Sequence, residues 1–174
     1  MGNTFRKILS FISCKICWIV LAAVWITGLF AGMYFGANAG DHYFLLMRTA
    51  VDTRVSIVGL IANACLPFLL SAYAVYLGKP RLILLVCFCK AVLFTSCGFA
   101  VLLSFGSAGW LTRLLLQFSD IVLIPLFCWF SIRHIQGNRT TLSKDSALCL
   151  FAAALVGSID YCLVSPFLAM LIDV

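Results

Sequence analysis

Long apolar blocks separated by short polar segments dominate the pattern of this chain. The blocks cover residues 16–37, 55–78, 82–105, 110–133 and 147–172. Each is long enough to supply the roughly 20 apolar residues that a helix needs to cross a bilayer. A helix also satisfies its backbone hydrogen bonds within its own segment, as lipid requires. The pattern therefore predicts an all-α, polytopic integral membrane protein whose single transmembrane domain is a bundle of five helices.

Residues 41–54, between the first two blocks, follow a different pattern. Phe44, Met47 and Val51 recur at the spacing of one helix face, and the charged residues fall elsewhere. An amphipathic pattern of this kind is typical of a short helix that lies in the membrane interface. We therefore expect an interfacial segment here, since it is too polar to span.

The composition agrees with this topology and excludes several classes of protein. Of the 174 residues, 64% are apolar and 10% are charged, whereas a soluble domain is about 25% charged. The net charge of +6 comes from basic residues dispersed between the blocks, without the contiguous basic face that nucleic-acid binding requires. We expect the lipid bilayer, other membrane or cell-wall proteins and further copies of the chain as partners, and no nucleic acid.

The distribution of Lys and Arg predicts the orientation, because these residues are retained on the cytoplasmic side. With a cytoplasmic N-terminus, the segments on the outer side of the membrane hold only two basic residues, Arg48 and Arg54. The cytoplasmic segments then hold Arg6, Lys7, Lys15, Lys79, Arg81, Arg133, Arg139 and Lys144. We therefore expect a multi-pass plasma (inner) membrane protein with its N-terminus in the cytoplasm and its C-terminus outside.

Cysteine and histidine residues give little sign of a cofactor. Most of the nine cysteines fall inside apolar blocks, where a thiol packs as a small hydrophobe. Cys14 and Cys17 form a single C-x-x-C without the second ligand pair of a structural zinc site. His42 and His134 fall at membrane edges and are interpreted as interfacial. No metal and no cofactor are expected.

The first block carries glycines at four-residue intervals, Gly28, Gly32 and Gly36. This spacing places them on one helix face, where the absence of side chains lets another helix approach closely in lipid. We predict a helix-packing face here, and the sequence leaves open whether its partner lies in this chain or in another.

Ionisable and polar residues inside the blocks are the main candidates for function, because a charge at the bilayer centre costs at least about 2.5–3.5 kcal/mol. Arg113, Gln117 and Asp120 follow i, i+4, i+7 spacing and share one helix stripe, and Lys90 on the preceding helix is long enough to reach toward Asp120. The predicted intramembrane polar layer comprises Asn63, Lys90, Arg113, Gln117, Asp120 and Asp160.

Two interpretations of this layer stay open. In one, the carboxylates exchange a proton or an ion across the bilayer. In the other, Lys90, Asp120 and Asp160 form a structural ion-pair group that fixes helix register. Catalytic motifs such as H-E-x-x-H, G-x-S-x-G and a Gly-rich phosphate loop are absent from the sequence, so we expect no catalytic residues and no enzyme.

Short motifs between the second and fourth blocks add a family resemblance. They are Leu66–Leu70, Cys87–Phe94, Gly98–Ala100, Gly106–Trp110 and Ile124–Pro125. Together they resemble the stage II sporulation protein M family. The resemblance implies a bacterial inner-membrane protein that recruits peptidoglycan-degrading partners during engulfment, with Lys90 at the position of the family's lysine. Asp120 and Asp160 match no residue of the family pattern.

Two functions follow from these observations as expectations. The first is a non-enzymatic membrane scaffold or partner-recruiting subunit in cell-envelope remodelling, with the glycine face and the interfacial segment as contact surfaces. The alternative is a small transporter, or a transporter subunit, that uses the intramembrane Lys/Asp layer for proton or ion coupling.

Overall fold

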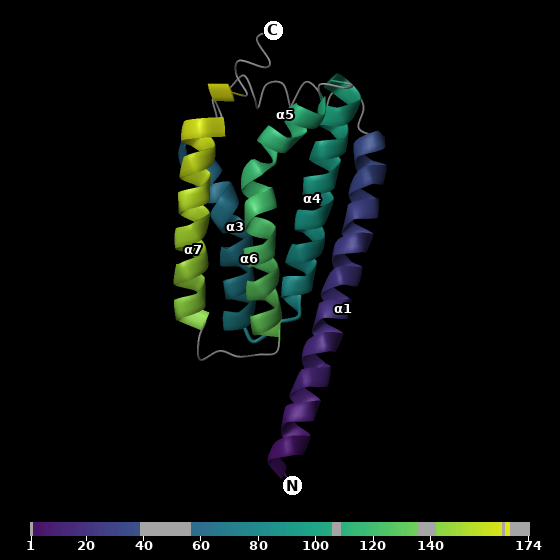
Figure 1. Ribbon diagram of the computed structural model, residues 1–174, viewed down its shortest axis with the longest axis vertical. Coiled ribbons are helices and arrows are strands. Elements are labelled where there is room, and N and C mark those ends of the chain that lie inside the picture. The colour runs from purple at the N-terminus through teal and green to yellow at the C-terminus, as the bar shows by residue number, and fades with distance from the viewer. Residues whose placement is uncertain (1, 39–56, 106–108, 136–141, 165, 168–174) are drawn as a thin grey trace.

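The described part of the computed structural model consists almost entirely of helices (Figure 1). It describes residues 2–38, 57–105, 109–135, 142–164 and 166–167. In chain order, the elements are α1 (Gly2–Ala37), α3 (Ile57–Tyr76), α4 (Leu82–Phe105), α5 (Gly109–Leu116), α6 (Phe118–Ile135), α7 (Leu142–Ile159) and the π-helix η2 (Asp160–Val164). The long helices run side by side in alternating directions, as the all-α bundle prediction requires.

Within the described residues, five helical segments are long and apolar enough to cross a membrane. They are Lys15–Ala37, Ile57–Tyr76, Leu82–Leu103, Phe118–Ile135 and Leu142–Val164. The prediction of a multi-pass helical bundle is therefore confirmed. The interfacial segment predicted at 41–54 lies outside the described residues, as does the predicted end of the last span at 172.

The last span begins earlier than expected, at Leu142 rather than at 147. Lys144 and Asp145 lie in its first turn and make the sequence look like a loop. A carboxylate in the first turn of a helix is favoured by the helix dipole, and Asp145 is also paired with basic side chains of α6. The helix therefore begins in a charged segment that lies before its apolar part.

The fourth block is bent rather than straight. Backbone hydrogen bonds from Gln117 N to Arg113 O (3.0 Å) and from Ile121 N to Gln117 O (2.9 Å) carry the helical pattern across the junction between α5 and α6. The two helices nevertheless point in different directions, with α5 inclined toward α4 (Figure 1). The bend lies beside the polar residues of this span.

A tight turn joins α3 to α4. Gly78 has a φ of 74°, which a residue without a Cβ adopts at little cost. Lys79 N then bonds Ala74 O at 2.9 Å and Gly78 N bonds Val75 O at 3.0 Å, the hydrogen bonds of a Schellman C-cap. Pro80 follows, where α3 can no longer continue.

The most extensive helix pairings join α1 to α4 and α3 to α7. The glycine face of α1 lies against α4: a side-chain carbon at Gly32 would lie 2.6 Å from the Val92 carbonyl oxygen and 2.8 Å from Thr95 Cβ. Gly28 and Gly36 meet Ala91 and Ser96 in the same way. The predicted packing face thus has its partner within this chain, so the expectation that it is a contact surface for other proteins is wrong.

Aromatic rings fill the centre of the bundle between α3 and α6. Phe68 makes edge-to-face contacts with Phe127 and Phe130, with ring centroids 5.4 and 5.9 Å apart. Rings in this geometry contribute attraction beyond their buried area. Cys87 of α4 adds a thiol contact to the Ser131 hydroxyl at 3.5 Å. The buried cysteines Cys87 and Cys149 are thus packing residues, as the sequence predicts.

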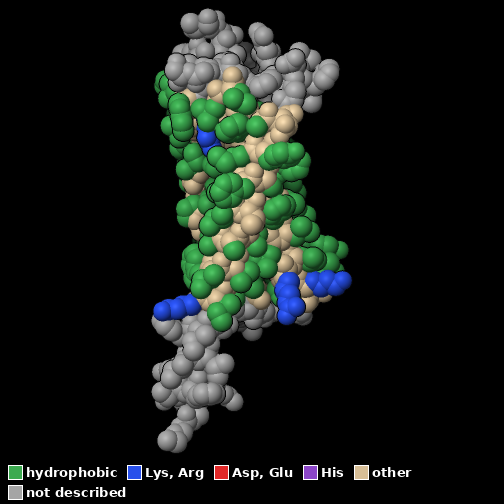
Figure 2. Space-filling model, turned by 90° about the vertical axis from the view of Figure 1, so that its right-hand side faces the viewer, with side chains coloured by type: hydrophobic (Ala, Val, Ile, Leu, Met, Phe, Trp, Pro, Cys, Tyr) green, Lys and Arg blue, Asp and Glu red, His purple; other side chains and the backbone are tan. Residues whose placement is uncertain are grey.

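The outside of the bundle is apolar. Figure 2 shows hydrophobic side chains over the sides of the described helices, with most of the visible Lys and Arg side chains at one end and one nearer the other end. Large apolar side chains such as Ile19, Phe30 and Phe151 are about two-thirds exposed. A surface of this kind suits lipid rather than water.

Candidate intramembrane polar site

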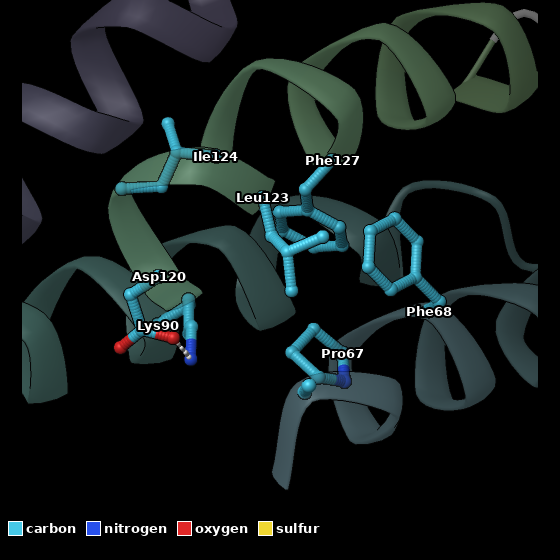
Figure 3. Close-up of a pocket in the computed structure, with 8 residues that line it drawn as sticks. Pro67, Phe68, Lys90, Asp120, Leu123, Ile124 and Phe127 are labelled. Atoms are coloured by element: carbon cyan, nitrogen blue, oxygen red, sulfur yellow. Dashed lines mark hydrogen bonds and ion pairs between the residues drawn. The ribbon is translucent and has the colours of Figure 1, made fainter. Parts of the chain in front are cut away.

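Lys90 and Asp120 form the centre of the candidate site. Lys90 Nζ lies 2.6 Å from Asp120 Oδ1, and the two side chains are 15% and 20% exposed. Lys90 projects from the middle of α4 and Asp120 from the first turn of α6, so the ion pair joins two spans (Figure 3). A charge-assisted hydrogen bond of this length is among the stronger protein contacts. It offsets much of the cost of placing both charges inside the membrane.

A small cavity borders this ion pair, with Lys90 and Asp120 on one side and the rings of Pro67, Phe68 and Phe127 on another (Figure 3). Its volume of about 10 Å³ for the centre of a water-sized sphere is at the lower limit of what one water molecule needs. The lining residues are Ala64, Pro67, Phe68, Lys90, Asp120, Leu123, Ile124 and Phe127. The site can therefore hold a proton or a water molecule without rearrangement, but nothing the size of a metabolite.

Asp160 lies near Ser119 of α6 and is only 6% exposed. The Ser119 side chain, next to Asp120 in the sequence, hydrogen-bonds the Asp160 carboxyl, and Asp120 acts on the same carboxyl electrostatically. Asp160 is also the first residue of η2, and short π-helical segments inside α-helices are frequent at functional sites. The structure thus brings a second carboxyl, from a third span, near Ser119 and Asp120.

Arg113 and Gln117 form a separate group one turn away. Gln117 is 4% exposed, accepts a hydrogen bond from Arg113 Nε at 3.2 Å and donates one to the Phe94 carbonyl of α4. Gly98 makes room for the guanidinium, since a side-chain carbon there would lie 2.5 Å from Arg113 Nε. These contacts hold the bent α5–α6 segment against α4. They do not involve Asp120, which pairs with Lys90.

Asn63 does not join this layer. Its side chain is exposed on the outside of α3, whereas Ala64, Phe68 and Ser71 form the buried face of that helix. The placement of Asn63 in the polar layer was therefore wrong. Because α3 is apolar on every side, its sequence gives no periodicity from which the inward face could be identified.

A second ionic group lies where α6 and α7 meet, and the sequence interpretation missed it. Asp145 Oδ2 lies 2.8 Å from Arg133 Nε and 3.2 Å from His134 Nε2. His134 is fully buried, with its ring 4.5 Å from that of Phe130. His134 lies in the last turn of α6, at the edge of the span as predicted, but its side chain is buried between helices rather than exposed. Basic residues that end one span and an acidic residue that begins the next are the sequence signal for such a pair.

Comparison with known proteins adds no further constraint: no family model, no curated protein and no solved structure matches this chain. In the part of the chain that the structure describes, no three His, Cys, Asp or Glu side chains lie together as metal ligands would. The chemistry available at the site is therefore that of one ammonium, two carboxyls and neighbouring hydroxyl and amide groups.

Proposed function

We propose that this protein is a small ion-coupled membrane transporter, or the membrane subunit of one, with Lys90, Asp120 and Asp160 as its coupling residues. The observation that supports this most directly is the 2.6 Å ion pair between Lys90 and Asp120, which joins two spans beside a cavity. Ionisable residues at such positions are expensive and commonly mark ion or proton pathways.

Irregular helices surround these residues and support the same function. The α5–α6 bend lies at Gln117, three residues before Asp120, and η2 begins at Asp160. Pro67 and Pro125 interrupt the backbone hydrogen bonding of α3 and α6. Transporters place their substrate and ion sites where membrane helices are interrupted, because these segments can rearrange.

The scaffold function has less support from the geometry. Its glycine contact surface is covered by α4, and its other surface, residues 41–54, lies outside the described residues. A role in partner recruitment of the sporulation protein M type stays a prediction from sequence resemblance.

We further propose the orientation with a cytoplasmic N-terminus, in the plasma (inner) membrane. Lys15, Lys79, Arg81, Arg133 and Lys144 all belong to the end of the bundle from which α1 enters. This is the asymmetry that the positive-inside rule associates with the cytoplasm. Labelling of single cysteines from either side of intact membranes tests it.

Charge displacement in reconstituted membranes tests the coupling function. Purified protein in liposomes on a solid-supported membrane would be subjected to jumps of pH, Na⁺ or K⁺, and the capacitive current recorded. We expect a transient current for the wild-type protein that is lost in Lys90→Met/Asp120→Leu. In this double variant both charges leave together, so neither is left buried without its partner.

The second ion pair provides a matched control. Arg133→Met/Asp145→Leu also removes two opposite charges that bridge helices, but at the bundle end, and we expect its current to equal that of the wild-type protein. Wild-type currents no larger than those of the Lys90/Asp120 double variant in all three jumps would overturn the proposed function.

A further inference from the structure

A layer of three aromatic rings borders the central cavity. Phe68 and Phe127 line the cavity beside Lys90 and Asp120 (Figure 3). The Phe68 ring contacts both other rings of the layer, those of Phe127 and Phe130, with centroids 5.4 and 5.9 Å apart. The three phenylalanine side chains are 2%, 3% and 0% exposed. This ring layer is therefore a closely packed apolar barrier directly next to the ion pair.

The ring layer lies between the ion pair and the basic end of the bundle, where α3 and α6 finish beside Lys79 and Arg133. Phe127 and Phe130 follow Asp120 by 7 and 10 residues on α6, roughly 10 and 15 Å at the helical rise. Both α3 and α6 run toward the basic end (Figure 1). A path through the centre of the bundle from the ion pair to this end would therefore pass through the ring layer.

Buried polar groups lie on the other side of the ring layer. Ser71 follows Phe68 by about one turn on α3, and its hydroxyl is fully buried and makes no hydrogen bond with the described residues. Ser131 follows Phe130 directly and has the Cys87 thiol as its neighbour at 3.5 Å. The rings thus separate polar groups near the basic end from the charges of the central site.

Ser71 lacks the hydrogen bond that hydroxyl groups inside helices commonly make. Thr27, Ser96 and Ser158 each donate to the carbonyl four residues earlier in their own helices, at 2.9, 2.8 and 2.8 Å. A buried hydroxyl without a partner costs free energy, and water that entered between the helices would supply that partner. We therefore interpret Ser71 as a group that meets water in another state of the bundle.

Both helices that carry the rings have a proline next to them. Pro67 lies directly before Phe68 in α3, and Pro125 lies two residues before Phe127 in α6. Proline removes a backbone hydrogen bond and favours a bend in the helix. A change of bend at either proline would move one ring away from the ring on the other helix.

We propose that the ring layer is the gate between the Lys90–Asp120 site and the basic end, and that the structure holds this gate closed. This inference rests on the proposed function and specifies how one side of its site is closed. A transporter opens its site to one side at a time, and an apolar constriction closes a path because water leaves it. Bending at Pro67 and Pro125 separates the rings, so that water reaches Ser71 and connects the site with the basic end.

Labelling of a cavity residue from one side of the membrane tests the gate. Leu123 lines the cavity and is 7% exposed, so Leu123→Cys places a thiol on the cavity wall. A membrane-impermeant methanethiosulfonate is added to sealed vesicles on either side, and peptide mass spectrometry measures modification of residue 123 separately from that of the native cysteines. Because labelling follows the open fraction of the gate, we expect Leu123→Cys/Phe68→Ala to react about tenfold faster than Leu123→Cys, from the basic end only.

Phe151→Ala provides a matched control, because it shortens a ring that is 65% exposed on the outside of α7. Combined with Leu123→Cys, it should leave the labelling rate from either side unchanged. A rate from the basic end that does not rise with Phe68→Ala, or that rises equally from both sides, would overturn the gate. If Phe68→Ala does not fold, Phe68→Leu removes the ring but keeps an apolar side chain, and the same criteria apply to it.

These results separate the gate from the proposed function. Charge displacement by the wild-type protein, together with labelling that does not change when the ring is removed, would retain the transporter and reject this gate. Faster labelling from the basic end without any charge displacement by the wild-type protein would retain the barrier formed by the rings and reject transport.

Discussion

The two ionic groups of this protein both attach α6 to a neighbouring helix, but one lies within the spans and the other at the end of the bundle. In the central pair, Lys90 and Asp120 are 15% and 20% exposed. In the end group, Arg133 is 40% exposed while Asp145 is 11% exposed. A guanidinium near the bundle end can turn toward water if its partner is lost. Lys90 lies within the membrane span Leu82–Leu103.

This difference separates a structural ion pair from a functional one. The end group joins α6 to α7 through charges at the end of the bundle, close to water. A structural role in connecting these two helices is enough to account for it. The central pair introduces two charges where apolar side chains would also pack, and buried ion pairs are often no more stable than such replacements. The variants below test this contrast through stability, from the largest expected effect to the smallest.

Asp120→Leu alone should lower the free energy of unfolding by about 3–5 kcal/mol, because it leaves the Lys90 ammonium buried without its carboxylate. Unfolding in mixed detergent micelles, followed by circular dichroism, measures the change. A loss below about 1 kcal/mol would show that Lys90 reaches water or another acceptor, and that the two ionic groups do not differ in this respect.

Asp145→Leu should cost less, about 1–2 kcal/mol. It removes the carboxylate that lies 3.2 Å from the buried His134 Nε2, and loss of a polar neighbour from a buried polar group costs about 1–3 kcal/mol. Arg133 remains able to reach water. The same unfolding measurement applies, and a cost equal to that of Asp120→Leu would contradict the distinction between centre and end.

The double variant Lys90→Met/Asp120→Leu should have a free energy of unfolding within about 1 kcal/mol of the wild-type protein, or above it, since both charges leave together. Unfolding of the two single variants and the double variant in parallel gives the coupling energy between the side chains. A double variant as unstable as Asp120→Leu would mean that the pair is needed for the fold itself.

Arg133→Met should have the smallest effect, about 0–1 kcal/mol, as is usual for partly exposed ion pairs. His134 remains beside Asp145, and Met retains much of the aliphatic contact with the neighbouring Trp129 ring, over which the Arg133 guanidinium lies at 5.2 Å. A shift in thermal stability larger than that of Asp145→Leu would identify Arg133 as the principal partner of the group.

The sequence predicts the helical class and the spans because these depend on length and apolar content. Residues 82–105 match α4 at both ends. The sequence also places Lys90 within reach of Asp120 on adjacent antiparallel helices, and the structure shows the contact itself. The predicted helix boundaries are wrong where a charged residue belongs to the helix end, as Asp145 does in the first turn of α7.

The orientation of side chains about each helix is harder to predict. Asn63 and Ala64 are neighbours in an almost uniformly apolar helix, yet one is exposed and the other lines the cavity. In a soluble protein, polar residues would show which side faces water. In lipid, the outer face is as apolar as the core, so only packing decides. The burial of His134 and the bend at Gln117 were unpredictable for the same reason.

The pairing of α1 with α4 also affects the order in which the helices assemble during synthesis. Gly32 lies 60 residues before Val92, so a ribosome adding about 5–20 residues per second needs roughly 3–12 s to make the partner of a finished α1. During this interval the grooved face of α1 is in contact with lipid or with the insertion machinery. The packing of α1 is thus completed only when α4 has been made, and the intervening α3 must be accommodated before they meet.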